Sequence, residues 1–585
     1  MFLPTTKNEM ERLGWERADI ILISGDCYID SPNDGTAVIG KVLNNAGYKV
    51  GIIAQPDINS SDDINRLGEP ALFWGVSAGC VDSMVANYTA QKKRKNSDDT
   101  TPGGENNRRP DRAVMAYTNL IRRYNKNTKP IIIGGIEASL RRVAHYDYWT
   151  DSVRRSILFD SKADILVYGM AERTITELAE RLKISEDYRD IRGIAYIAKE
   201  MRKDFLEIAS YEDCAGDKGK FLEMFMTFYH NNDPITANGL CQKHADRYLI
   251  QNPPAYHLEQ EELDQVYGLK YEYDVHPYYK AMGKVKSLDT IQFSIMSQRG
   301  CFGECNFCSI TQHQGRRVVS RTEESIIEEA KKLIKHKDFK GYISDVGGAS
   351  ANMYQMECPI LTKKGGCTKK RCVFPEVCKS MSIDHKPQID LLEKLRKLDG
   401  IKKVFVGSGV RYDMVIADHQ SGRQYLETVA EHHISGQMKI APEHISDDVL
   451  HLMGKPSNKN LIKFKKEFDS ITQRLGKKQF LTYYFIAAHP GCTERETVEL
   501  KKFISHELKL NPEQVQIFTP TPSTISTLMF YTGIDPFTGK RVFSEKDASG
   551  KKRQKDIITE SSRFRQEDSP KKKSEKYRIG RKSGY

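Results

Sequence analysis

The placement of cysteine constrains this chain more than any other feature of its sequence. Seven of the 12 cysteines lie between residues 301 and 378. Disulfide frameworks are typical of small secreted chains, whereas this chain has 585 residues and starts without a continuous apolar segment. We therefore expect a reducing, cytoplasmic setting in which the clustered thiols bind metal. No run reaches the roughly 18 apolar residues that a membrane helix needs, so we expect no membrane span.

Three cysteines, Cys301, Cys305 and Cys308, form a CxxxCxxC motif with Gly300 and Gly303 beside them. Glycine lets the backbone loop, so the three thiolates can converge on one centre. Three thiolates would hold three irons of a [4Fe–4S] cluster and leave the fourth iron open, whereas an electron-transfer cluster uses four cysteines. An open iron can bind a substrate or cofactor directly. A zinc site completed by a distant ligand is the alternative.

A second group of cysteines lies in a predicted insertion at residues 356–385. Its members are Cys358, Cys367, Cys372 and Cys378. Four thiolates can close a structural zinc site or hold an auxiliary iron–sulfur cluster, and His385 is a candidate substitute ligand. The spacing matches neither paired CxxC zinc motifs nor a ferredoxin motif. Zinc, an iron–sulfur cluster and a loop with free thiols therefore all stay open.

Strand-like and helix-like segments alternate from residue 290 onward. Strands are expected at residues 290–296, 341–346, 402–406, 437–441, 479–487 and 514–518, and helices at 322–336, 389–398, 425–432, 458–475 and 494–508. Six such β/α units predict parallel strands joined by right-handed crossovers. The cysteine motif follows the first strand, at the end where functional residues gather in β/α barrels.

The first part of the chain predicts a separate, doubly wound α/β sheet. Expected strands at residues 18–24, 48–53, 71–76, 130–133 and 163–167 alternate with helices at 36–45, 112–124 and 174–182. We therefore divide the chain into a sheet domain at residues 1–195, a linker region at 196–285 and a second α/β domain at 286–545.

The last residues, 546–585, predict a disordered basic tail. Residues 551–585 hold 13 Lys and Arg against 5 Asp and Glu, a net charge of +8. Few large apolar residues are present there to offset the entropy of ordering the chain. A solvated terminal segment is the simplest interpretation, and contact with RNA is the functional alternative.

The cysteine motif, with Phe307 directly before its third cysteine, resembles the signature of radical S-adenosylmethionine (SAM) enzymes. The resemblance implies a partial (β/α)6 barrel and a [4Fe–4S] cluster, held by the three cysteines, whose open iron binds SAM. It also implies that Phe307 lies near the adenine and that the backbone of Gly347 and Gly348 binds the SAM amino group. Ser408 and Arg411, at the end of the third strand, are candidates for holding the SAM carboxylate or ribose. It implies no particular catalytic residue.

Five shorter stretches are similar to YgiQ-type radical SAM proteins: residues 25–30, 50–57, 134–142, 252–255 and 276–279. N-terminal sheets in this superfamily resemble cobalamin-binding domains. The loop at residues 30–35, where such domains carry a cobalt-ligating histidine, contains no histidine here, which argues against cobalamin. The resemblance implies no particular substrate.

The resemblance therefore implies an enzyme that reductively cleaves SAM to a 5′-deoxyadenosyl radical, with reduced flavodoxin or ferredoxin as the electron donor. Two alternatives stay open. One is an iron–sulfur redox or binding protein that does not cleave SAM. The other is an RNA-modifying radical SAM enzyme that contacts nucleic acid through the basic tail.

Overall fold

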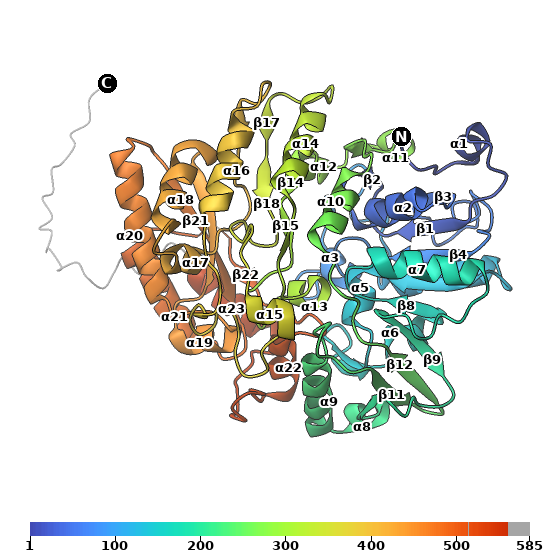
Figure 1. Ribbon diagram of the computed structural model, residues 1–585. Coiled ribbons are helices and arrows are strands. Elements are labelled where there is room, and N and C mark those ends of the chain that lie inside the picture. Colours follow the sequence, from blue (N-terminus) through green and yellow to red (C-terminus); the bar gives the residue numbers. More distant parts are fainter. Residues whose placement is uncertain (513, 560–585) are drawn as a thin grey trace, which may run out of the picture.

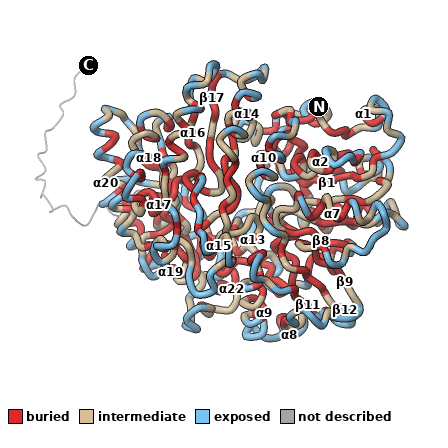
Figure 2. Tube along the Cα trace, in the orientation of Figure 1, coloured by how far each residue is buried: buried red, intermediate tan, exposed pale blue. Residues whose placement is uncertain are grey.

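The computed structural model describes residues 1–512 and 514–559. Two α/β halves lie side by side in Figure 1, the first in blue and green and the second in yellow to red. The buried segments in Figure 2 run through the strands of both halves. The two halves meet where α13 (Ile310–Gln314) of the second half packs against α5 (Gly135–Leu140) of the first.

The first half is built on a nine-stranded sheet. Its parallel part follows the spatial order β3, β1, β4, β5, β8, with the bounds Val50–Ala54, Ile20–Ser24, Phe73–Ser77, Ile131–Gly134 and Ile165–Val167. All five strands overlap the ranges predicted from sequence, because each is a largely buried apolar run of the kind that parallel sheets require. The order 2-1-3-4-5 reverses between β1 and β4, and open sheets bind ligands at such a point.

Helices cover both faces of this sheet, as a doubly wound fold requires. α2 (Gly35–Asn45) and α7 (Glu172–Lys183) pack on one face, and α4 (Ala113–Tyr124) packs on the other. Because successive side chains of a strand point to opposite faces, β1 supplies both cores. Ile20 and Leu22 pack on the α2 side, whereas Ile21 and Ile23 pack on the α4 side.

The sheet extends beyond the predicted boundary at residue 195. Four further strands join it: β9 (Ile194–Ala198), β12 (Arg247–Gln251), β11 (Leu240–His244) and β10 (Leu206–Ile208). The linker prediction is therefore wrong for the residues up to Gln251. β9 pairs antiparallel with β8 and with β12, and β12 pairs antiparallel with β11, whereas β10 pairs in parallel with β11. Charged residues such as Lys243 of β11 and Arg247 of β12 interrupt the apolar pattern. Helices α8 (Tyr211–Gly216) and α9 (Lys218–His230) connect β10 to β11.

The second half contains strands at all six predicted positions. β14 (Ser294–Met296) pairs in parallel with β18 (Asp345–Gly347), and β17 (Tyr342–Ile343) with β19 (Lys403–Val404). Val410 forms a parallel bridge to Ile440 of β20 (Gln437–Glu443). β20 in turn pairs in parallel with β21 (Phe480–Ala487), and β21 with β22 (Gln516–Ile517). The pairings among the strands at the predicted positions are thus parallel, as their alternation with helices predicted, whereas the short strands at Gln298–Arg299 and Val319–Ser320 pair antiparallel.

The connecting helices of the second half also lie where the sequence predicted them. They are α14 (Glu323–Ile334), α16 (Lys386–Arg396), α18 (Gly422–Thr428), α20 (Lys459–Arg474) and α21 (Glu494–Phe503). α18 and α21 continue as π-helical turns at Val429–His433 and Ile504–Leu508. α14 begins after the predicted cap Thr322, whose hydroxyl oxygen accepts the N–H of Ser325 at 3.2 Å.

Shorter elements complete the described chain. They are α1 (Lys7–Arg12), β2 (Ile29–Asp30), α3 (Ser83–Asn87), β6 (His145–Asp147), β7 (Ser152–Arg154), α6 (Ile157–Ser161), α10 (Gln260–Gly268), β13 (Asp274–Val275), α11 (Pro277–Lys280), α12 (Leu288–Ile291), β15 (Gln298–Arg299), β16 (Val319–Ser320), α15 (Pro359–Lys364), α17 (Tyr412–Ala417), α19 (Asp447–Met453) and α22 (Ile525–Thr532).

The start of the predicted disordered tail is helical. α23 (Ala548–Thr559) packs against α21 and buries Lys551, Gln554 and Ile558, so the prediction is wrong for these residues. The Lys551 ammonium donates to the Tyr148 hydroxyl at 2.9 Å and lies over the Tyr148 and Phe530 rings. Spacings of three and four residues put these buried side chains on one helix face. Residues 560–585 lie outside the described part of the chain.

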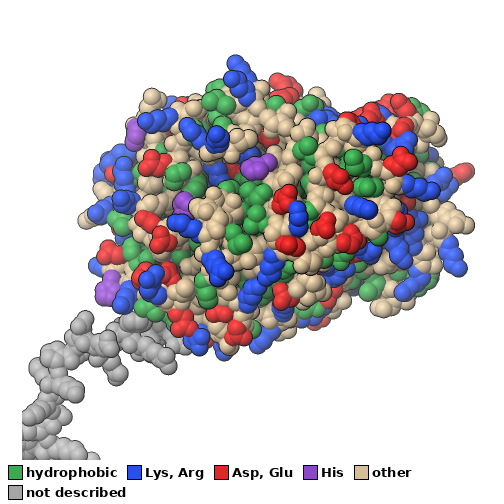
Figure 3. All heavy atoms as spheres, turned by 90° about the horizontal axis from the view of Figure 1, so that it is seen from below, with side chains coloured by type: hydrophobic (Ala, Val, Ile, Leu, Met, Phe, Trp, Pro, Cys, Tyr) green, Lys and Arg blue, Asp and Glu red, His purple; other side chains and the backbone are tan. Residues whose placement is uncertain are grey.

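The described residues contain no helix with the length and apolar character to cross a bilayer. Figure 3 shows Lys and Arg side chains interspersed with Asp and Glu on the face seen from below. This face therefore carries no large patch of one sign that would attract a polyanion.

Candidate active site

The CxxxCxxC loop follows β15, beyond the carboxyl end of β14. Gly300 opens the loop with a φ of +83°, and a Cβ at this position would overlap the carbonyl oxygen of Arg317. Glycine is therefore required here, both for the left-handed backbone and for the close approach. α13 begins two residues after Cys308. The loop is thus fixed between a strand and a helix.

The thiols of this loop lie close together. A Cβ built on Gly303 would lie 3.2 Å from the Cys301 sulfur and 3.6 Å from the Cys305 sulfur, so both sulfurs flank that glycine. Cys301 Sγ accepts the N–H of Gly303 at 3.3 Å. Burial raises the pKa of Cys308 to about 12, and its neighbours Cys305 and Cys301 add to the shift. Forming three thiolates here requires compensating positive charge.

Arg411 supplies a positive charge beside these thiols. Its Nη1 lies 3.6 Å from Cys305 Sγ, and its other nitrogens donate to the Asp413 carboxylate, with Nε at 2.9 Å from Oδ1. Burial opposes the charge, but Asp413 and Cys305 together raise the pKa of Arg411. The guanidinium, predicted as a SAM contact, is thus already engaged by a carboxylate and a thiol.

Among residues 1–512 and 514–559, no three side chains of His, Cys, Asp or Glu gather around a single metal position. Zinc needs its ligands around one point, whereas a [4Fe–4S] cluster distributes three thiolates over three irons. The thiols of the loop, with Arg411 beside Cys305, match the donor set that such a cluster uses.

The second cysteine group packs against the first. Cys358 is buried at the start of α15, Cys367 is exposed, and Cys372 and Cys378 are half-buried. Three of the four join Cys301 and Phe302 in a small apolar cluster. In the described part of the chain these side chains form no group of three potential ligands around one point, and a metal at this group stays a sequence prediction. His385 is also committed elsewhere, because its Nδ1 lies 2.7 Å from Asp418 Oδ2.

The strand-end residues predicted to contact SAM lie at the same end of the strands as the cysteine loop. The Gly347 carbonyl accepts the N–H of Ser297 at 2.7 Å, and a Cβ on Gly348 would lie 2.6 Å from the carbonyl oxygen of Gln298. Ser408 donates its hydroxyl and its N–H to the Asp345 carboxylate, the latter at 3.1 Å. Ser408 is thus tied to the neighbouring strand end.

Phe307 lies half-buried on the other side of the loop. Its ring contacts His489 at 6.2 Å between centroids, edge to face, and it packs beside the buried Cys492. Glu443, at the carboxyl end of β20, was not singled out as a site residue from sequence. It is buried, has a left-handed φ of +68°, and lies 3.8 Å from Lys455 Nζ. Such an outlier at a strand end is typical of functional positions.

A cavity of about 440 Å³ lies between the two halves. Its walls include the carboxyl ends of β1, β4, β5 and β8, and also Ser309 and Ile310, which directly follow Cys308. This volume is typical of small-molecule sites, roughly 300–1,000 Å³. The cavity therefore joins the reversal point of the first sheet to the cysteine loop. Sequence reasoning missed it, because its walls come from segments far apart in the chain.

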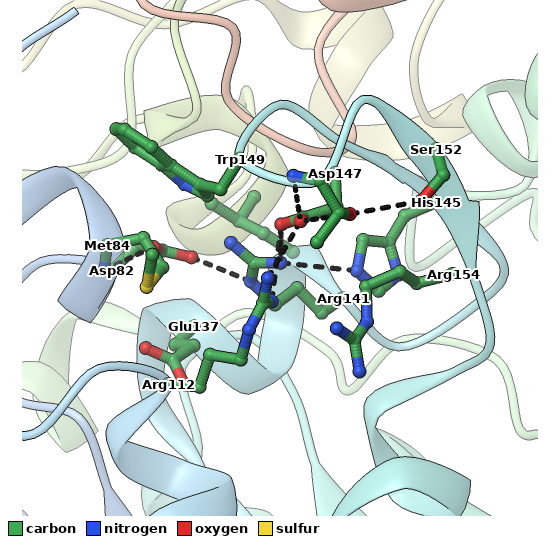
Figure 4. Close-up of polar contacts among 12 residues, drawn as sticks. Asp82, Met84, Arg112, Glu137, Arg141, His145, Asp147, Trp149, Ser152 and Arg154 are labelled. Carbon is green, nitrogen blue, oxygen red and sulfur yellow. Dashed lines mark hydrogen bonds and ion pairs between the residues drawn. The ribbon is translucent and has the colours of Figure 1, made fainter. Parts of the chain in front are cut away.

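A buried ion network fixes one wall of this cavity. In Figure 4, Arg141 lies between Asp82 and Asp147, with Nε–Oδ2 and Nη1–Oδ1 distances of 2.8 and 3.0 Å. Arg112 reaches Asp147 at 2.8 Å, and Glu137 accepts the N–H of Ser83 at 2.8 Å. The network links α3, α5 and β6. Its two arginines are paired with its two aspartates, and Glu137 is held by hydrogen bonds, so we assign the network a structural role.

Comparison with known families identifies the class of protein. The model described as Radical SAM N-terminal matches residues 2–294, and the model of the Radical SAM superfamily matches residues 295–504. The chain belongs to the radical SAM superfamily, and it is a SAM-dependent radical enzyme. The resemblance inferred from the cysteine motif is confirmed.

Relatives define the subgroup. UPF0313 protein FN0734 of Fusobacterium nucleatum is 56% identical over 565 residues, covering 96% of this chain and 100% of the relative. A UPF0313 protein of Thermotoga neapolitana is 47% identical over 561 residues, covering 95% and 98%. The chain is thus similar to UPF0313 proteins over nearly its whole length.

A solved structure shares the fold. The cobalamin-dependent SAM radical enzyme OxsB with aqua-cobalamin bound superposes with a TM-score of 0.50 at 14% identity, covering 88% of this chain and 55% of OxsB. At this identity the likeness concerns fold alone. Because residues 30–35 contain no histidine, the sequence argues against cobalamin in this chain, and this stays a prediction.

Proposed function

We propose that Cys301, Cys305 and Cys308 hold a [4Fe–4S] cluster and that the chain reductively cleaves SAM. A cluster bound there would supply one electron to SAM, whose C5′–S bond then breaks to give methionine and a 5′-deoxyadenosyl radical that takes a hydrogen atom from the substrate. The observation that carries the proposal is the loop itself, in which neighbouring thiols meet the Arg411 guanidinium at the end of a run of parallel strands.

The residues of this chain have separate tasks in that proposal. Arg411, held by Asp413, offsets thiolate charge. Gly347 and Gly348 offer backbone groups to the SAM amino group, and Phe307 offers a ring face to the adenine. Ser408 has a revised role, because its hydroxyl already donates to Asp345. It positions the end of the third strand for SAM.

The six parallel strand positions of the second half would form the partial barrel around this site. The reaction consumes electrons, so the chain needs a one-electron donor such as reduced flavodoxin or ferredoxin. We propose that it works in the cytoplasm, where its 12 cysteines stay reduced. A second metal centre at the group from Cys358 to Cys378 is left as a sequence prediction.

The test is SAM cleavage by the full-length chain. The protein is reconstituted anaerobically with iron and sulfide, reduced with dithionite, and assayed by chromatography for 5′-deoxyadenosine. We expect product from the wild type and none from Cys301→Ala. Cys214→Ala, a buried cysteine of α8 in the first half, is the matched control and should retain activity.

A reconstituted cluster that binds SAM without forming 5′-deoxyadenosine would contradict cleavage and favour the redox-protein alternative. Equal product from wild type and Cys301→Ala would contradict the assignment of the ligands.

A further inference from the structure

The cavity between the two halves has an uneven lining. Most of its wall is apolar and comes from the sheet and from α13, for example Ile23, Val76, Ile133 and Ile310. A few polar groups interrupt this surface. Apolar walls with a small number of placed polar groups are typical of small-molecule sites, in which the polar groups fix orientation and specificity.

Two acidic groups on this wall already have a cationic partner, and a histidine there is uncharged. Asp82 pairs with Arg141 at 2.8 Å, and Glu172 pairs with Arg299 through one carboxylate oxygen. Burial lowers the pKa of His313 to about 4, so its imidazole is neutral at pH 7. Within the described residues, the second oxygen of Glu172 has no hydrogen-bond partner.

Asp34 differs from these groups. Its carboxylate accepts the N–H of Ala37 at 2.9 Å as the N-cap of α2, and the described chain places no lysine, arginine or histidine within ion-pair distance. The nearby acids Asp26 and Asp30 have partners of their own, Arg109 and Lys41. The helix dipole offsets only about half a charge at a helix N-terminus. Asp34 therefore faces a largely apolar cavity with no cationic partner among the described residues.

An apolar cavity of this kind selects the charge of its ligand. A carboxylate of low solvent exposure interacts more strongly with an opposite charge than it would in water. A second anion there would meet Asp34 and the unpartnered oxygen of Glu172, and like charges repel at short range. The lining thus favours a ligand with an apolar body and one positive group.

We propose that this cavity is the substrate chamber and that it takes a small molecule with an apolar body and a protonated amine or guanidinium beside Asp34. The assignment rests on the proposed function, because Ser309 and Ile310 bring the cavity wall next to Cys308. A ligand held at Asp34 then extends along the apolar wall toward the loop where the radical would form.

The test uses dansylcadaverine, a fluorescent apolar probe with one primary amine, in an anaerobic titration of the full-length reconstituted chain. Dansylamide and dansylglycine are its uncharged and anionic counterparts. We expect blue-shifted, saturable fluorescence with dansylcadaverine and at least tenfold weaker binding of both counterparts. Asp34→Asn should weaken dansylcadaverine at least tenfold without a change in Tm, because asparagine caps a helix as well as aspartate does.

The matched control is Asp217→Asn. Asp217 caps α9 by the equivalent contact, to the N–H of Lys220 at 3.2 Å, and also accepts the N–H of Gly219 at 2.6 Å, but it is exposed and outside the cavity. This variant should bind the probe like wild type. Ile136→Trp, which fills the cavity from its wall, should abolish saturable binding.

Equal or tighter binding of dansylglycine would overturn the proposal, as would unchanged binding to Asp34→Asn. Cobalamin that binds in the cavity, displaces the probe and is insensitive to Asp34→Asn would also overturn it. The titration does not depend on SAM turnover. Probe binding without 5′-deoxyadenosine formation would therefore contradict the proposed function and leave the amine site standing. Formation of 5′-deoxyadenosine without probe binding would support the proposed function and contradict the amine site.

Discussion

Single charged residues decide what the cysteine loop can hold. From the sequence, Arg411 is a candidate for holding the SAM carboxylate or ribose, and in the structure its guanidinium contacts Asp413, two residues along, and Cys305. Which of several strand-end polar groups an arginine meets depends on backbone geometry that periodicity does not reveal. The same holds for Glu443, whose left-handed backbone no sequence pattern indicates.

Replacing Arg411 by glutamine tests whether its positive charge offsets the charge of the thiolates. Loss of a positive charge beside Cys305 should make the more negative, reduced cluster less stable, because cluster potentials depend on nearby charge. We expect a lower midpoint potential, by roughly tens of millivolts, in a redox titration followed by electron paramagnetic resonance. Arg423→Gln, an exposed residue, should leave the potential unchanged. An unaltered potential in Arg411→Gln would contradict this role.

The charge of Asp34 predicts a pH dependence for probe binding. Burial, and then the neighbouring Asp26, raise the pKa of Asp34 to about 7. Asp30 and the Cys80 thiol also lie close to it. The amine of dansylcadaverine stays protonated up to a pH of about 10, so only the carboxylate changes. Dansylcadaverine affinity should fall as the pH drops from 8 to 6, and this fall should vanish in Asp34→Asn. A flat profile for the wild type would count against the carboxylate as the recognition group.

At the scale of elements, regular patterns made most of the fold predictable. The parallel strands appear as short apolar runs, and their helices as amphipathic segments with caps such as Thr322. The elements that were missed have weak sequence patterns. β10, β11 and β12 each carry a charged residue, and the buried face of α23, formed by Lys551, Gln554 and Ile558, lies in a basic segment. Long lysine side chains can bury their stems, which composition does not show.

α23 should contribute to stability. Ile558 is fully buried against α21 and β21, so Ile558→Ala should lower the free energy of unfolding by about 2–5 kcal/mol. Urea denaturation measures the change, and the exposed Lys552→Ala is the control. If both variants unfold alike, α23 does not dock as described.

The left-handed backbone of Gly300, directly before Cys301, should be needed for the chain to load iron and sulfide. Gly300→Ala would place a Cβ against the carbonyl of Arg317 in a left-handed conformation. We expect it to lower iron and sulfide content after reconstitution. Gly409→Ala is the matched control, since no atom lies within 4 Å of a Cβ there. This variant should bind iron and sulfide like the wild type. Normal loading of Gly300→Ala would show that the loop conformation is not needed.

At the scale of the molecule, the two halves line one cavity. The first half brings its sheet reversal point, and the second brings the cysteine loop, to the same cavity. The motif could be recognised from sequence because its residues are contiguous. The cavity could not, because β1, β4, β5, β8 and α13 contribute to it from across more than 290 residues.

The most direct measurement is the iron and sulfide content of the full-length chain purified without oxygen. We expect about four irons and four sulfides per chain. Both contents should fall to nearly none when Cys301, Cys305 and Cys308 are all replaced by alanine. A content of about eight irons would add a second cluster at the Cys358 group. Zinc in place of iron, or iron that persists after the triple replacement, would contradict a [4Fe–4S] cluster at these three cysteines.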